Sequence, residues 1–364
     1  MSKKILALVT DAFGSYGGIA QYNCDLLNAL AASDYVSRVT VLPRIADATF
    51  FVRNPKLCLL PPVGNKFAYA ARALVLALTE QPDLIYNGHL YHGPLARCLA
   101  SITRAKLVSQ LHGTEVWSEL RRRLLAPLEA SDVVLCVSSD TEKRYLAQAA
   151  PGTQNAHVLP NTVGDEFVPG DRPAARRKFG ISDEFVLLTV GRLDPRNAGY
   201  KGHERVIQAL RTLERSEREI VYLIAGMGDD RERLERIAQD LGVTDNVRFL
   251  GKVPREDLPD LYRAADLFAL PSSGEGFGIV YLEAMACGTP AIGLTVGGVP
   301  DALDHGRLGV LCDPDSFTTT LRLTIRSINL DEEDRADLAR RVRKKFGRGA
   351  FRASVSTVLR PTFA

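Results

Sequence analysis

The chain has 364 residues, of which 46% are hydrophobic and 24% charged, and its formal net charge is +3. This length exceeds one typical core and predicts two domains. The near balance of charge argues against a nucleic-acid-binding protein, and six scattered cysteines without a C-x-x-C pair are typical of reduced thiols in the cytosol.

Short apolar runs alternate with helical patterns in both halves of the chain. Strands are expected at 5–10, 38–42, 57–60, 83–87, 106–111 and 132–137, and then at 185–190, 220–225, 247–250, 266–270, 290–293 and 308–312. Helices between them are expected at 19–32, 203–214, 230–241 and 257–264, among others. This alternation predicts parallel, doubly wound sheets.

Residues 161–183 are rich in proline, glycine and charge and are interpreted as an interdomain linker. The pattern as a whole supports two Rossmann-like domains with a ligand cleft between them. The four residues before the first strand are too few for a signal sequence, and no window approaches the ~18 consecutive apolar residues of a membrane-spanning helix.

A glycine-rich turn follows the first expected strand and contains Gly17 and Gly18. It either brings backbone N–H groups to a ligand or is a bare tight turn, and it lacks the G-x-G-x-x-G spacing of dinucleotide sites. His112 follows the strand at 106–111. Its place at the carboxyl end of a strand makes a functional role as plausible as a structural hydrogen bond.

Two cations, Arg192 and Lys201, follow the first strand of the second half. They could neutralise a diphosphate, although alone they would fit a solvated surface pair better. Gly226 lies in a further strand-to-helix turn that either approaches a nucleotide or satisfies the turn geometry. Asp313-Pro-Asp315 is interpreted as an ordinary turn, so we expect no metal site.

The most informative block is Glu275 and Glu283, which bracket seven residues. Glu275 stands beside Gly276 and Gly278, and Glu283 lies on the expected helix that follows. A helical rise of ~1.5 Å per residue sets the two carboxyl groups on the order of 10 Å apart. That spacing suits an elongated ligand with hydroxyls at both ends and a phosphate between them.

In this order, the motifs resemble the retaining, nucleotide-sugar-dependent glycosyltransferases of the GT-B fold with an E-x(7)-E motif, the bacterial family 4 or group 1 type. The resemblance implies residues 1–165 as an acceptor-binding Rossmann-like domain, 166–340 as the donor-binding one, and 341–364 as a C-terminal helix that returns to the first. It implies transfer of a hexose, mannose or glucose, from GDP-mannose or UDP-glucose to a saccharide or lipid-linked acceptor, as in exopolysaccharide biosynthesis. No cofactor or metal is expected.

The resemblance also implies roles for single residues. Arg192 and Lys201 hold the leaving diphosphate, Glu275 binds sugar hydroxyls, and Glu283 binds the ribose. His112 contacts the donor sugar. Further donor contacts are expected at Gly17, Gly18, Gly226, Gly276, Phe277 and Gly278.

Two other functions use the same fold. A sugar-nucleotide epimerase would act on one substrate without an acceptor, and a non-catalytic protein would bind the nucleotide sugar without turnover. The localisation expected is cytoplasmic, with possible contact to the inner face of the cell membrane. Residues 66–78 and 121–125 combine apolar and basic side chains, which fit either a membrane surface or an ordinary core-facing helix with a solvated charge run.

Overall fold

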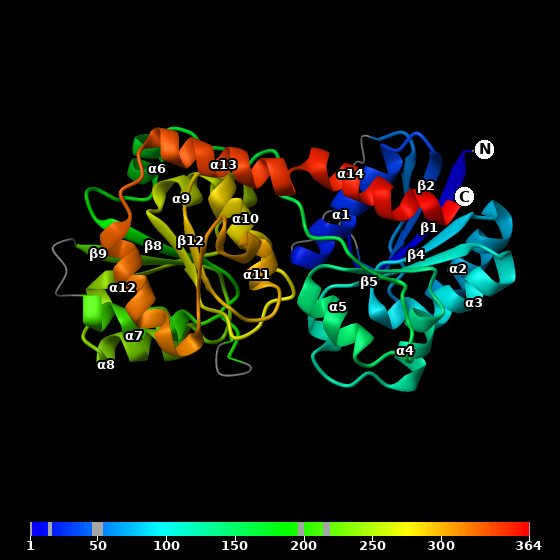
Figure 1. Ribbon diagram of the computed structural model, residues 1–364, viewed down its shortest axis with the longest axis horizontal. Helices are drawn as coiled ribbons and strands as arrows, with labels where there is room; N and C mark the ends of the chain where they lie inside the picture. The colour runs from blue at the N-terminus through cyan, green and yellow to red at the C-terminus, as the bar shows by residue number, and fades with distance from the viewer. Residues whose placement is uncertain (1, 14–16, 46–53, 196–199, 214–218, 364) are drawn as a thin grey trace. The chain divides into compact units, whose positions relative to one another are not determined.

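The computed structural model describes residues 2–13, 17–45, 54–195, 200–213 and 219–363 (Figure 1). The chain forms two compact units: unit 1 comprises Met1–Thr162 and Arg348–Ala364, and unit 2 comprises Val163–Gly347. Each unit contains a sheet whose strands all pair in parallel. The prediction of two doubly wound α/β domains is therefore confirmed.

Within the described residues, the sheet of unit 1 has seven strands in the order β3-β2-β1-β4-β5-β6-β7. Their bounds are β1 Lys3–Val9, β2 Val36–Pro43, β3 Leu57–Leu59, β4 Leu84–Asn87, β5 Lys106–Leu111, β6 Val133–Cys136 and β7 Ala156–Val158. The first six agree with the expected strands to within two residues. β7 was not expected from the sequence because it is short and carries the polar, exposed His157.

The helices of unit 1 cover both faces of its sheet. They are α1 Gly18–Ala31, α2 Lys66–Glu80, α3 Gly93–Thr103, α4 Arg122–Glu129, α5 Ser139–Leu146 and α14 Arg348–Leu359, with the short 3-10 helices η1 Leu90–His92, η2 Thr114–Val116 and η8 Arg360–Phe363. Leu6 and Leu8 of β1 pack with Tyr69 of α2 and Leu99 of α3 in one core cluster. Side chains two residues apart in a strand point to the same face, so α2 and α3 cover the face of β1 that carries Leu6 and Leu8.

The sheet of unit 2 has six strands among the described residues, in the order β10-β9-β8-β11-β12-β13. They are β8 Phe185–Val190, β9 Ile220–Ala225, β10 Val247–Gly251, β11 Leu267–Leu270, β12 Ala291–Leu294 and β13 Val310–Cys312. All six agree with the expected strands to within two residues. The strands inside this sheet are nearly continuous apolar runs, because a parallel sheet is covered on both faces, whereas the edge strand β10 contains Arg248 and is only partly buried.

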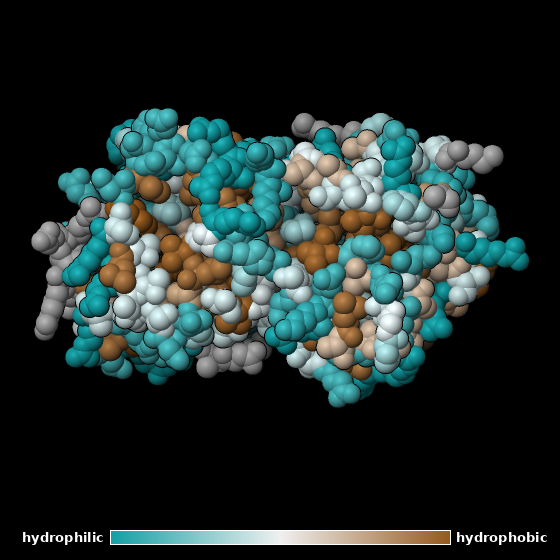
Figure 2. All heavy atoms as spheres, viewed as in Figure 1, coloured by the Kyte–Doolittle hydropathy of each residue, from teal (hydrophilic) through white to brown (hydrophobic). Residues whose placement is uncertain are grey.

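Helices also surround the sheet of unit 2. They are α6 Arg172–Lys178, α7 His203–Leu213, α8 Arg231–Asp240, α9 Leu258–Ala264, α10 Ile279–Ala286, α11 Val299–Ala302, α12 Phe317–Ser327 and α13 Glu332–Phe346, with the 3-10 helices η4 Thr244–Asn246, η5 Arg255–Asp257, η6 Asp304–Gly306 and η7 Pro314–Ser316. The outward side of α13 is hydrophilic in Figure 2, as its charged sequence requires. No helix in the described parts of the chain is long and apolar enough to cross a membrane.

The segment 161–183 is not a free linker. Phe167 and Ile181 are buried in unit 2, and α6 lies within the segment. The C-terminal helix also differs from the expectation of a helix over 341–364. Gly347 is extended, so α13 ends at Phe346 and only α14 joins unit 1.

The strand order reverses once in each sheet. The reversal lies between β1 and β4 in unit 1 and between β8 and β11 in unit 2. The loops that leave two such strands run to opposite faces, which opens a crevice at the carboxyl ends of the strands. Ligands of open α/β sheets bind in this crevice. Of the predicted site residues, Gly17 and Gly18 follow β1, Arg192 and Lys201 follow β8, and Glu275 follows β11, whereas His112 follows β5 and Gly226 follows β9.

Candidate active site

Lys201 and Glu275 form a buried ion pair at the switch point of unit 2. Lys201 Nζ donates to Glu275 Oε1 at 2.6 Å, and the two side chains are only 17% and 10% exposed. Ser272 Oγ donates to the same carboxylate oxygen at 2.7 Å. Lys201 precedes α7, whereas Ser272 and Glu275 follow β11, so residues far apart in sequence meet here because β8 and β11 are neighbours.

The electrostatics keep Lys201 charged. Burial lowers the pKa of this ammonium, but the adjacent Glu275 carboxylate together with Tyr200 more than offsets it, so the pKa is raised above its ordinary value. The charge of nearby Arg192 acts in the opposite direction. The Arg192 side chain is exposed, so it adds a second, accessible cation beside the pair.

Neighbouring backbone holds the Glu275 loop on two sides. Ser273 N donates to Tyr200 O at 2.7 Å, and Gly298 N donates to Glu275 O at 2.8 Å. A Cβ atom at Gly298 would lie 2.1 Å from Gly276 O, so only glycine allows this approach. The Glu275 carboxylate is therefore fixed before any ligand arrives.

Glu283 lies on α10, the helix that the sequence predicted after the glycine loop, and it is buried. Tyr262 OH donates to Glu283 Oε2 at 2.8 Å. Burial, and then the charge of Glu283, raises the pKa of Tyr262 well above its ordinary value, so the phenol keeps its proton. The Phe277 ring packs against Phe346 at 5.9 Å, which leaves its backbone as the part that a ligand can reach.

Gly226 has a structural reason to be glycine. Its φ is 154°, and a Cβ atom there would lie 1.8 Å from Gly191 O. The turn after β9 therefore packs directly on the turn after β8, and the position would need glycine even without a ligand. The donor contact at Gly226 stays a prediction.

His112 in unit 1 is a neutral hydrogen-bonding group. Its Nε2 lies 3.0 Å from Gly88 O, and its backbone N donates to Glu115 Oε2 at 3.1 Å. Burial lowers the pKa of His112 to about 4. Because a carbonyl only accepts, Nε2 carries the proton and Nδ1 is left as an acceptor for a ligand hydroxyl.

Gly17 and Gly18 begin α1 and border open space. A Cβ atom added at either position would meet nothing within 4 Å. Helix N-termini with free N–H groups favour anions, which agrees with the predicted ligand turn. Residues 14–16 of this turn and 196–199 before Lys201 lie outside the described residues.

Two family matches cover most of the chain. Residues 171–345 match the family "Glycosyl transferases group 1", and residues 16–167 match "Glycosyltransferase Family 4". Both matches coincide with the two parallel-sheet units. The chain belongs to the group 1 glycosyltransferases.

This glycosyltransferase is similar to curated actinobacterial enzymes. It is 36% identical over 245 residues to a GDP-mannose-dependent alpha-(1-6)-phosphatidylinositol monomannoside mannosyltransferase of Mycolicibacterium smegmatis, a match that covers 63% of this chain and 62% of the relative. It is 42% identical over 185 residues to a D-inositol 3-phosphate glycosyltransferase of Mycobacteroides abscessus. This match covers 50% of this chain and 41% of the relative. The chain thus spans less than two thirds of either relative.

Solved structures share the fold of this glycosyltransferase. A crystal structure of Anabaena HepE in complex with UDP superposes with a TM-score of 0.78 at 22% identity and covers 98% of this chain and all of the other. A sucrose-phosphate synthase from Thermosynechococcus elongatus superposes with a TM-score of 0.75 at 23% identity, and the match covers 99% of each chain. With the two parallel-sheet units, these likenesses establish the predicted GT-B fold.

Two partners of the glutamates in this glycosyltransferase were not expected from the sequence. Ser272 lies just before the informative block, and its spacing of three residues from Glu275 was the available signal. Tyr262 lies 21 residues before Glu283 and had no sequence signal. Among the residues that the structure describes, no group of three or more His, Cys, Asp or Glu side chains could hold a metal ion.

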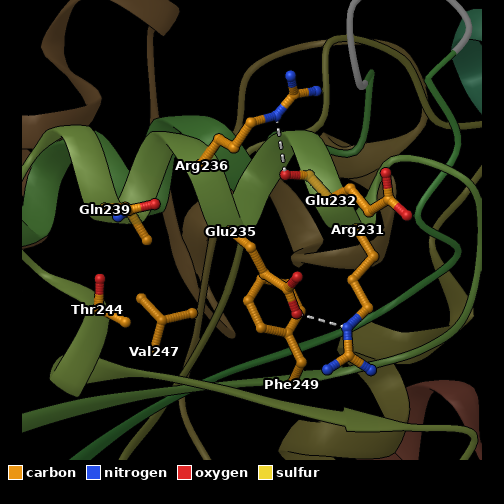
Figure 3. A pocket seen from close by; sticks show the side chains of 9 residues that line it. Arg231, Glu232, Glu235, Arg236, Gln239, Thr244, Val247 and Phe249 are labelled. Carbon is orange, nitrogen blue, oxygen red and sulfur yellow. Dashed lines mark hydrogen bonds and ion pairs between the residues drawn. The ribbon is translucent and has the colours of Figure 1, made fainter.

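A surface hollow of about 790 Å³ lies apart from these residues (Figure 3). It is lined by residues of α8, η4 and β10, and an ion pair between Arg231 and Glu235 lies in its wall. Arg231 Nε donates to Glu235 at 2.6 Å while the Arg231 guanidinium lies 5.3 Å from the Phe249 ring. None of the predicted site residues lines this hollow, so it is not the predicted donor site.

Proposed function

We propose that this chain is a retaining hexosyltransferase that moves mannose or glucose from a nucleoside diphosphate sugar to a saccharide or lipid-linked saccharide acceptor in glycan assembly. The observation that carries the proposal is the buried Lys201–Glu275 pair, with Arg192 beside it, at the switch point of unit 2. The names of the relatives support a nucleotide sugar: the M. smegmatis enzyme is GDP-mannose-dependent, and the Anabaena structure is a complex with UDP.

In this proposal each end of the donor has its own partner. Lys201 and Arg192 bind the diphosphate, and Glu275 accepts hydrogen bonds from sugar hydroxyls while the backbone of 276–278 lies alongside. Glu283, held by Tyr262, accepts hydrogen bonds from the ribose. His112 Nδ1 accepts from a hydroxyl of the transferred sugar, and Gly17, Gly18 and Gly226 are further donor contacts.

The residues act mainly through charge. The anomeric C–O bond breaks and its electron pair goes to the diphosphate, while the acceptor hydroxyl attacks from the same face and passes its proton to a leaving phosphate oxygen. Fixed cations beside the leaving group stabilise its developing charge, and one such contact is worth ~3–4 kcal/mol of barrier. In this scheme Glu275 positions the sugar, and no metal ion is required.

The test is transfer from labelled GDP-mannose and UDP-glucose to saccharide and polyprenyl-linked acceptors, with the product anomer read by NMR. We expect transfer with retention that persists in EDTA, and Arg192→Gln should lower kcat about 100-fold. Arg211→Gln on the exposed side of α7 is the matched charge control and should act like wild type. Failure of every nucleotide sugar to bind or react would overturn the function, and an inverted product or loss of activity in EDTA would overturn the mechanism.

We also propose peripheral contact of unit 1 with an anionic membrane through α2. Phe67, Val75 and Leu78 are 87%, 53% and 49% exposed on this helix, and Lys66 and Arg72 flank them. An exposed apolar face with basic neighbours suits the interface of an anionic bilayer.

The second basic-apolar run, residues 121–125, does not share this property. Leu124 and Leu125 are buried in the core of unit 1, so the core-facing interpretation holds there. Flotation with vesicles of phosphatidylcholine and phosphatidylglycerol tests the surface on α2. Phe67→Ser with Val75→Ser should abolish binding, and Leu323→Ser, an exposed leucine of α12, should not. Wild-type protein that stays unbound would refute the proposal.

A further inference from the structure

A chain of buried hydrogen bonds lies beneath the loop that carries Lys201. The hydroxyl of Thr189 in β8 donates to the backbone oxygen of Ala269 in β11, and Tyr222 OH of β9 lies 2.7 Å from Thr189 Oγ1. His203 is the first residue of α7, and its Nδ1 lies 3.3 Å from the same phenol oxygen. The start of α7 is therefore tied by side chains to three neighbouring strands of the sheet.

The ring of His203 is buried and neutral. It is 2% exposed, and burial lowers its pKa to about 4, although the Arg192 backbone acts in the opposite direction. The charge of Lys201 also lowers this pKa. Near pH 7 the imidazole is thus a hydrogen-bonding group that adds no third positive charge beside the two cations of the loop.

The backbone between Lys201 and His203 has little freedom. Gly202 has a φ of 78°, and a Cβ atom there would lie 2.2 Å from Pro271 O, so the chain passes directly over the end of β11. One residue separates Lys201 from His203. A shift of the imidazole therefore moves the backbone from which the Lys201 ammonium reaches Glu275 at 2.6 Å.

Packing alone does not account for an imidazole at this position. Nε2 of His203 is buried without a hydrogen-bond partner among the described residues, and an unpaired buried polar atom destabilises a fold. An apolar side chain of similar size would fill the same space without that cost. The hydrogen bond to Tyr222 is the interaction that only a polar ring supplies here.

We propose that the hydrogen-bond chain Thr189–Tyr222–His203 positions Lys201, so that its ammonium meets the leaving diphosphate beside Glu275. His203 and Tyr222 are positioning residues, because both side chains are buried and act through Lys201. A misplacement of ~1 Å can lower the rate of a reaction about 100-fold. This inference rests on the proposed transferase function, and it concerns how the leaving-group cation is held.

The first test measures transfer from GDP-mannose and UDP-glucose by the full chain. Tyr222→Phe and His203→Leu should each lower kcat about tenfold with little change in the donor KM, because a displaced cation loses its contact mainly in the transition state. The double variant should lose no more than either single variant, since both break the same chain. His203→Asn retains a hydrogen-bonding group near the place of Nδ1 and should restore most of kcat. Tyr145→Phe removes an equally buried phenol in unit 1 and should leave kcat unchanged.

The second test needs no substrate. If the chain holds Lys201 against Glu275, Tyr222→Phe should shift the midpoint of urea denaturation clearly in the wild type and much less when Lys201→Met is already present. Tyr145→Phe should shift it equally in both proteins.

The two tests separate this inference from the transferase function. A normal kcat in Tyr222→Phe, or equal midpoint shifts by Tyr222→Phe in the two proteins, would overturn the inference. A wild-type chain that transfers no sugar would refute the transferase function, and the urea comparison would then decide by itself whether Tyr222 and His203 position Lys201.

Discussion

Lys201 Nζ and Glu275 Oε1 lie 2.6 Å apart in a pair that is largely removed from solvent. Removing one member of a buried pair leaves the other charge without compensation, which costs more than the pair itself contributes. The same two groups are proposed to meet the diphosphate and the sugar of the donor. Stability and transfer should therefore depend on them in different ways.

The single variants Lys201→Met and Glu275→Gln should each lower the free energy of unfolding by about 3 kcal/mol, because each leaves a buried charged or polar partner unpaired. The double variant should lose much less than the sum. All three should lose transfer by about 100-fold or more. Urea denaturation followed by circular dichroism measures the free energy of unfolding of each variant. Initial rates of transfer are measured on the same samples. Additive losses of stability would show that the pair is not coupled.

Tyr262→Phe removes the phenol that donates to Glu283. The carboxylate then loses a fixed donor, so the KM for the nucleotide sugar should rise about tenfold while kcat stays nearly constant, the signature of lost ground-state binding. Tyr145→Phe is the control, since it removes a hydroxyl that bonds to Asn155 in unit 1. If Tyr262→Phe and Tyr145→Phe had similar KM values, Tyr262 would have no role in donor binding.

Gly298→Ala places a Cβ atom where Gly276 O now lies, only 2.1 Å away. Two backbone segments must separate, so we expect a loss of about 1–3 kcal/mol of stability and weaker donor binding. Gly349→Ala in α14 meets nothing within 4 Å and should stabilise the chain by up to about 1 kcal/mol. Differential scanning calorimetry with and without UDP or GDP measures both effects. An unchanged Gly298→Ala protein would mean that the loops are not in contact.

Acid should destabilise unit 1 through its buried histidines. Burial lowers the pKa of His92 and of His112 to about 4, below the ordinary value near 6.5. Between these values the unfolded chain binds more protons than the folded one, so stability falls as pH decreases from about 6.5 to 4. His112→Gln should reduce this slope in urea denaturation at pH 5 and pH 7.5. An identical slope in the variant would refute the assignment.

The periodic pattern of apolar residues in the sequence was enough to predict the fold. The twelve expected strands are all present, because each is a short apolar run that only a sheet covered on both faces can bury. Gly347 was harder to interpret, since a charged helical pattern continues on both sides of it and only packing decides that the chain breaks there. The 161–183 segment has the composition of a linker, yet Phe167 and Ile181 give it a place in the core.

The sequence by itself determined which residue types the site contains, because Glu275, Glu283, Arg192 and Lys201 occur in a motif order with a chemical rationale. Only the tertiary structure decided their partners. Lys201 meets Glu275 across 74 positions and Tyr262 meets Glu283 across 21, and both contacts depend on which strands are neighbours in the sheet. The same holds for Thr10 and His92 in unit 1. The order of the strands in a sheet brings these side chains together. That order cannot be predicted from the local periodicity of the sequence.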